Sequence, residues 1–164
     1  VTINSVNLDP FDPKTLVLKI SSASLNISES DKTSVLLQAA CTLDLQGFVG
    51  TYTAVNARYT SPLTVTVALG PVANTLSVTN VDGMGGTTVI ELSTDVTKPT
   101  IIYRSQEFDT PIYTHSSYGS VWATTLTPEK SNYNSCDFSM NLEFKRCVSI
   151  GCFGGSRVIS MTKN

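Results

Sequence analysis

The only histidine is the residue of this chain best suited to catalysis. A serine or cysteine hydrolase usually needs a histidine base, so His115 would have to fill that role. Ser116 and Ser117 follow it directly, but adjacent residues on a strand or loop point apart, and the chain has no Gly-x-Ser-x-Gly turn. We therefore expect that the protein is not an enzyme, and we keep a small hydrolase that uses His115 as the least favoured of three functions.

The second group with chemical potential is the four cysteines, Cys41, Cys136, Cys147 and Cys152. An even number suits two disulfides, which three pairings would satisfy. Cys147 and Cys152 are close enough in sequence to close a tight hairpin, with Gly151 easing the turn. Cys41 and Cys136 each lie in phase with the apolar face of a predicted strand. The pattern predicts a Cys147–Cys152 bond and a Cys41–Cys136 bond, and with them an oxidising compartment.

Metal binding is the alternative use of these side chains. A zinc ion would be held by His115, Cys136, Cys147 and Cys152, although the cysteine spacing is wider than in common structural zinc sites. Four buried thiols in a reducing compartment are a further alternative. Calcium could bind at Asp9 and Asp12, or at Asp82 in a glycine-rich turn, but no EF-hand spacing is present. We predict neither a metal nor a cofactor.

Aromatic residues gather in one stretch among small polar residues, and they are Tyr113, His115, Tyr118 and Trp122. Tyrosine and tryptophan mixed with serine and glycine are typical of binding loops, because rigid rings give contact area at low entropic cost. The sequence predicts an exposed loop over 106–118 whose rings contact a protein or stack on a sugar. The alternative is that Trp122 and one tyrosine belong to the core.

The elements that must position these residues are strands. Period-two alternation of apolar and polar residues is strongest over 35–45, 63–69 and 138–144, and it indicates strands with one buried face. Weaker runs cover 2–6, 16–27, 51–59, 76–81, 87–92, 100–104, 120–126 and 157–161. The core is predicted to include Leu37, Leu43, Val65, Val67, Phe138, Leu142 and Phe144.

Turn residues separate these runs at short intervals, and no stretch has sustained helical periodicity. We therefore predict an all-β protein: an antiparallel β-sandwich, Ig-like or jelly-roll-like, of roughly 8–10 strands with little or no helix. A single domain is expected over residues 1–164. Because the chain opens on Val1 and not on Met, it is interpreted as a mature product or a domain excised from a larger protein.

Composition restricts the partners. Charged residues make up 15% of the chain and the net charge is −2, so a nucleic-acid or polybasic membrane surface is not expected. No apolar run is long enough to span a bilayer, and no direct membrane insertion is expected. Asn26 begins an Asn-Ile-Ser glycosylation triplet, which fits an exposed site in a secreted glycoprotein.

These observations favour a recognition or attachment domain that is extracellular or lies on a virion or cell surface. Its binding residues are Tyr113, His115, Tyr118 and Trp122, and its partner is a protein receptor or a glycan. The alternative is a structural subunit of a coat or appendage that acts by self-assembly, as a homo-oligomer. High serine, threonine and asparagine content is common in secreted, adhesive and coat proteins, so composition alone does not separate the two.

Overall fold

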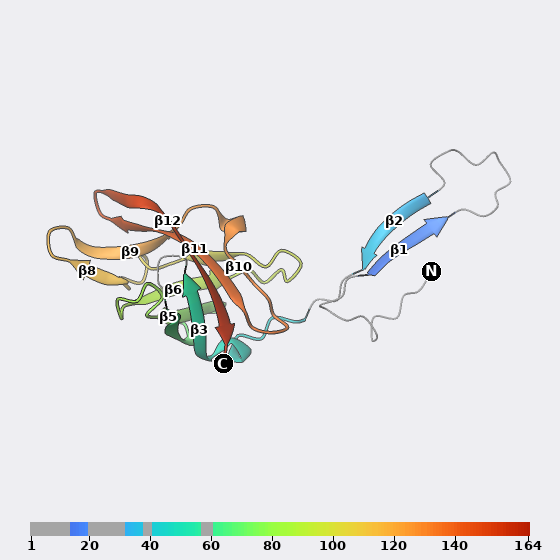
Figure 1. Ribbon diagram of the computed structural model, residues 1–164, viewed down its shortest axis with the longest axis horizontal. Coiled ribbons are helices and arrows are strands. Elements are labelled where there is room, and N and C mark those ends of the chain that lie inside the picture. Colours follow the sequence, from blue (N-terminus) through green and yellow to red (C-terminus); the bar gives the residue numbers. More distant parts are fainter. Residues whose placement is uncertain (1–13, 20–31, 38–40, 57–60) are drawn as a thin grey trace. The chain divides into compact units, whose positions relative to one another are not determined.

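The computed structural model describes residues 14–19, 32–37, 41–56 and 61–164 (Figure 1). The chain divides into two compact units, residues 1–41 and residues 42–164. The described part of the first unit is an antiparallel pair, β1 (Lys14–Lys19) and β2 (Lys32–Leu37), which runs from Lys14 opposite Leu37 to Lys19 opposite Lys32. Several predictions lie outside the described residues, namely Asn26, Asp9, Asp12 and the strand over 2–6.

The second unit is one antiparallel sheet curled into a half-barrel. Along the sheet the strands follow the order β7-β6-β5-β4-β3-β12-β11-β9-β8, and β10 also pairs with β11. Their bounds are β3 (Gly50–Asn56), β4 (Leu63–Leu69), β5 (Thr75–Thr79), β6 (Thr87–Leu92), β7 (Ile101–Tyr103), β8 (Tyr113–His115), β9 (Gly119–Thr125), β10 (Asn132–Tyr133), β11 (Met140–Val148) and β12 (Gly151–Lys163). Two short 3₁₀ turns accompany them, η2 (Gln46–Phe48) and η3 (Pro128–Lys130).

The curl of the sheet brings β7 next to β10. Thr100 and Asn132 form an isolated antiparallel bridge, and the backbone N–H of Ile101 donates to the carbonyl of Ser131 at 2.9 Å. The backbone N–H of Tyr103 also donates to Oγ1 of Thr125 on β9 at 2.8 Å. These bonds satisfy backbone groups at the edge of β7 that would otherwise be left unpaired.

Alternating burial shows why these segments are strands. On β4, Val65 and Val67 are buried while Thr64, Thr66 and Ala68 are exposed. The inner faces of the strands together form one apolar core, which contains Phe48, Tyr52, Leu76, Ile90, Leu92, Ile101, Leu142, Phe144, Ile159 and Met161, all buried. The predicted core residues Val65, Val67, Leu142 and Phe144 are confirmed.

The predicted antiparallel all-β class is confirmed, and the described residues contain no α-helix. They form a single curled sheet in the second unit, whereas the two-sheet sandwich stays a prediction. Residues 41–45, the end of the strongest alternating run, are wrong as a strand, because no neighbouring strand pairs with them. Phe138 is half-buried and has a φ of 58°, so β11 begins after it.

Two opposite ends can be defined on this unit from the strand registers. The base end is the end at which four neighbouring strand pairs finish. These last pairs are Lys163 with Tyr52, Gly50 with Val67, Leu69 with Leu76, and Thr75 with Glu91. We call the tip end the one where the β8–β9 and β11–β12 hairpins turn, at 116–118 and 149–150. In Figure 1 both hairpins lie at the left of this unit.

Candidate functional site at the two hairpin tips

The first hairpin at the tip end carries the aromatic residues that the sequence singled out. The predicted loop over 106–118 is only partly a loop, because Tyr113 and His115 lie on β8, where they pair with Val121 and Gly119. Residues 116–118 form the turn of the hairpin. Gly119 has a φ of +73°, a left-handed conformation that favours glycine, and it ends the turn. Tyr118 lies in this turn with half of its surface exposed, at 50%.

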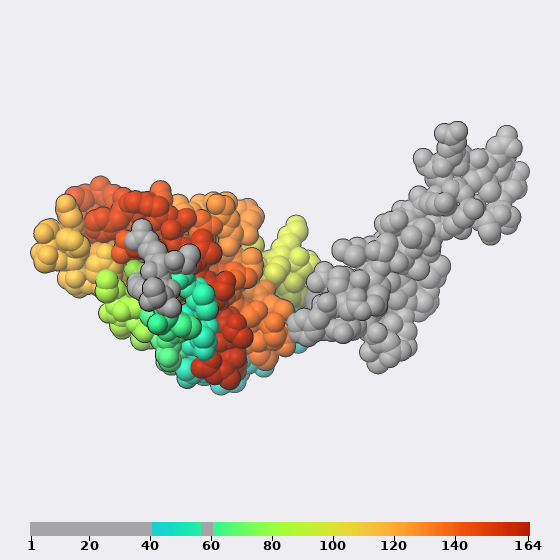
Figure 2. Space-filling model, in the orientation of Figure 1, coloured from blue at the N-terminus to red at the C-terminus, as the bar shows by residue number. Residues whose placement is uncertain are grey.

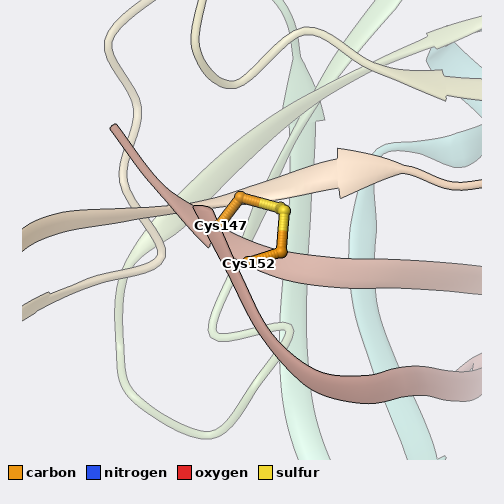
Figure 3. The surroundings of a disulfide bond; sticks show 2 residues. All are labelled: Cys147 and Cys152. Carbon is orange, nitrogen blue, oxygen red and sulfur yellow. A yellow bond between two sulfur atoms is a disulfide. The ribbon is translucent and has the colours of Figure 1, made fainter. Parts of the chain in front are cut away.

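The second hairpin is closed by a disulfide. Cys147 on β11 lies directly opposite Cys152 on β12, and their sulfur atoms are 2.03 Å apart, which confirms the predicted bond (Figure 3). Only Ser149 and Ile150 lie between the two strands. Ile150 is therefore held at the apex, where it is 82% exposed, more than any other large apolar residue in the described part of the chain. A large apolar side chain held this far out in water is an expected feature of an interaction site.

Ring contacts join the two hairpins. The centroids of His115 and Tyr118 are 4.9 Å apart, and Phe153 of β12 lies 5.9 Å from His115 and 5.6 Å from Tyr118. Aromatic pairs at these separations attract one another beyond simple burial. We call the tip surface the set His115, Tyr118, Ile150 and Phe153.

The other two predicted binding residues lie further back. Tyr113 is half-buried and packs against the core. Trp122 is half-buried and lies opposite Cys147 in the β9–β11 register. Its indole Nε1 is buried without a hydrogen-bond partner among the described residues. The structure thus brings His115 and Tyr118 together and places Tyr113 and Trp122 beneath them.

Sequence reasoning missed Ile150 and Phe153. A signal was present, because a hairpin closed by Cys147 and Cys152 has room for only a few residues at its turn, and an isoleucine there must face solvent. Phe153 carried no such signal. It reaches the other rings only through the tertiary arrangement, in which β11 lies between β12 and the β8–β9 hairpin and joins the two hairpins in one sheet.

His115 has specific neighbours. Its Nδ1 accepts a hydrogen bond from the backbone N–H of Ser117 at 3.1 Å, and its ring touches Tyr118 and Phe153. These contacts fix the imidazole within the tip surface and hold the turn of the β8–β9 hairpin in shape.

The cysteines do not hold a metal. All four are disulfide-bonded and none is free, so the zinc and free-thiol alternatives are wrong, because zinc binds the thiolate form. Within the described ranges, no three His, Cys, Asp or Glu side chains gather as they would around a metal ion.

Asp82 is engaged by arginines. Its side chain is 1% exposed and lies 3.6 Å from the guanidinium of Arg146 and 3.7 Å from that of Arg157. Both cations come from the long β11–β12 hairpin, so the glycine-rich turn that carries Asp82 is tied to the middle of that hairpin. This arrangement contradicts a calcium site at Asp82, because two positive groups would repel a cation.

The base end carries a surface hollow of about 610 Å³. We call it the end hollow, and its lining residues are Ser93, Asp95, Lys98, Pro99, Thr100, Glu129 and Asn132. Oδ1 of Asp95 accepts hydrogen bonds from Oγ1 of Thr97 at 2.6 Å and from its backbone N–H at 3.0 Å. These bonds lower the pKa of the Asp95 carboxyl and keep it charged.

Tyr133 holds one lining residue of the end hollow, Ser93. Its hydroxyl donates to the carbonyl of Ser93 at 2.6 Å. Burial, and then the negative charge of Asp95, raise the pKa of the Tyr133 hydroxyl, so it stays a hydrogen-bond donor. The Ser93 backbone is therefore held in place.

The described residues include no helix of the length and apolarity needed to cross a membrane. Comparisons of the chain with protein-family models, with curated proteins and with solved structures found no match.

Proposed function

We propose that this chain is a non-enzymatic recognition or attachment domain that works outside the cell or on a virion surface. The observation that carries the proposal is the tip surface, where two hairpins are joined by ring contacts and leave Ile150 and Tyr118 exposed. Exposed apolar and aromatic side chains on a rigid support act as anchors in protein interfaces. The disulfides are compatible with an oxidising compartment, and glycosylation at Asn26 would fit it.

A protein partner fits this surface better than a glycan. Isoleucine at an apex fills an apolar pocket, whereas sugars stack on the open face of an aromatic ring. The rings of His115, Tyr118 and Phe153 partly cover one another, so they offer less open surface on which a sugar could stack. The contact is therefore expected to centre on Ile150, with Tyr118 beside it.

The test compares attachment and stability in the same variants. Ile150→Ser and Tyr118→Ala should each weaken binding to target cells by about 10-fold or more, the loss expected for an anchor residue. The melting temperature should be unchanged in Ile150→Ser and only slightly lowered in Tyr118→Ala, which removes ring contacts with His115 and Phe153. Val72→Ser is the matched control, since Val72 is 53% exposed in the β4–β5 turn at the base end. A lowered melting temperature with normal attachment would place Tyr118 in the structure and reject the proposed contact.

A further inference from the structure

The tip surface and the end hollow lie at opposite ends of the same curled sheet. The hollow is lined by the β6–β7 loop and by the segment from η3 to β10, and the registers place both at the base end. The β6–β7 loop, yellow-green in Figure 2, lies on the far side of the unit from the two hairpins. One end of the unit thus presents a convex knob and the other a concavity.

The hollow is large enough for the knob. Sites of about 300–1,000 Å³ accommodate drug-sized groups, and the hollow measures about 610 Å³. Ile150 with a neighbouring ring is a group of that size.

The charges of the two ends are complementary. The parts of the two hairpins nearest the tip end, residues 113–125 and 144–157, have no aspartate or glutamate, and their charged side chains are the cations Lys145, Arg146 and Arg157. Arg146 and Arg157 are engaged by Asp82, which leaves Lys145 as the cation nearest the tip. The hollow has two carboxylates, Asp95 and Glu129, against the single cation Lys98. Opposite potentials favour contact between these ends and disfavour contact between two tips.

We propose that the partner of the tip surface is a second copy of this chain, whose end hollow receives Ile150 and Tyr118. The inference rests on the proposed function in taking the tip surface as a contact site. Because the two surfaces differ and lie at opposite ends, the contact is head-to-tail and does not close into a dimer. Repetition produces a filament or a ring of subunits, according to the rotation between neighbours, and in a filament the last copy keeps its tip free for an outside partner.

Sedimentation velocity of the full chain over a range of concentrations tests the assembly. The unmodified protein should form species larger than a dimer as its concentration rises. Ile150→Asp should raise the concentration needed for half-assembly by at least about 30-fold, the loss expected for an anchor residue. Glu129→Arg, which reverses a charge of the hollow, should have a similar effect, and Val158→Ser, at an exposed position on β12, should have none.

Mixing the two defective variants gives the decisive result. The Ile150→Asp copy keeps an intact hollow and the Glu129→Arg copy keeps an intact tip, so the mixture should form a 1:1 dimer and nothing larger. Circular dichroism confirms that each variant is folded, and Ile150→Ser and Glu129→Gln replace any that is not. A mixture that stays monomeric, or an unmodified chain that stays monomeric, overturns the proposal.

The outcomes also separate this inference from the proposed function. A monomeric chain whose cell attachment is lost with Ile150→Ser rejects head-to-tail assembly and supports recognition of another molecule. The opposite result is that Ile150→Asp abolishes assembly while Ile150→Ser and Tyr118→Ala leave cell attachment unchanged. That result supports the second copy as the partner and rejects attachment through the tip.

Discussion

A buried tyrosine hydroxyl predicts that the stability of the protein depends on alkaline pH. The hydroxyl of Tyr52 donates to the carbonyls of Phe48 and Phe138 at 2.9 and 3.0 Å, and its side chain is fully buried. Burial is the main cause that raises the Tyr52 pKa, followed by the charge of Asp137. Because the Tyr52 pKa is higher in the folded than in the unfolded state, its contribution to the free energy of unfolding is fully present below the ordinary tyrosine value of about 10. This contribution is lost as the pH rises above that value.

We therefore predict that the free energy of unfolding falls as the pH rises above about 10, and that Tyr52→Phe makes this fall smaller. At pH 7 the same change should cost about 1 kcal/mol, because two carbonyls lose their donor. Urea unfolding of both proteins across this pH range measures it. An identical pH dependence in the two proteins would show that other groups, such as the buried Tyr103, dominate.

The ion pairs of Asp82 give a second prediction at this scale. Asp82→Asn should lower the free energy of unfolding by about 3–5 kcal/mol, because Arg146 and Arg157 lose the negative charge that compensates them. Glu107→Gln is the control, since its carboxylate pairs with Arg104 at an exposed position and should cost less than about 1 kcal/mol. Chemical denaturation compares them, and equal losses would contradict the importance assigned to burial.

At the scale of the elements, the disulfide stabilises the β11–β12 hairpin. It closes a loop of only a few residues, so replacing both Cys147 and Cys152 by serine should cost roughly 2 kcal/mol on the chain-entropy view. Thermal unfolding with and without the double change measures the loss. Ser149→Ala, in the same turn, should leave the melting temperature unchanged, and a double variant as stable as the parent would contradict the prediction.

The alternation of burial along the strands gives a prediction about the two faces of the sheet. Leu142→Ala on β11 should cost about 2–5 kcal/mol, because Leu142 is fully buried in the core. Thr66→Ala on β4 should cost far less, since Thr66 faces solvent. Denaturant unfolding tests both, and indistinguishable losses would mean that the faces are wrongly assigned.

Periodicity predicted some elements to the residue and missed others for physical reasons. The run 63–69 coincides with β4 and the run 87–92 with β6, because each has paired neighbours on both sides. Residues 41–45 do alternate in burial, with Leu43 and Leu45 packed on the core, yet they have no ladder partner. Alternation reports which face is buried and does not report whether a neighbouring strand is there to pair.

The short strands show the opposite case. β8 has 3 residues and β10 has 2, which is too few for a period to appear, and both exist because longer strands offer them an edge. Only two of the four residues of the tip surface were predicted, because a sequence pattern finds only residues that are close together along the chain. His115 and Tyr118 are close in sequence and were found together, while Ile150 and Phe153 join them only through the tertiary arrangement.

At the scale of the whole molecule, the second unit contains the entire described core, from Phe48 to Met161. We predict that a chain of residues 41–164 folds on its own, with a β-type circular dichroism spectrum and a cooperative thermal transition within a few degrees of that of the full chain. The full chain is the reference in the same buffer. A fragment without a cooperative transition would show that the first unit is required for folding.

The pairing of β11 has a mechanical consequence. One edge of this strand pairs with β12 along its length, while the other edge pairs first with β10 and then with β9. A pull on Ile150 along the hairpin loads the ladders of the hairpin with β10, β9 and β3 in shear, so that their hydrogen bonds resist together and do not open one after another. The bond between Cys147 and Cys152 blocks the end at which peeling would begin. A molecule held by this tip should therefore withstand tension along the hairpin much better than tension across it.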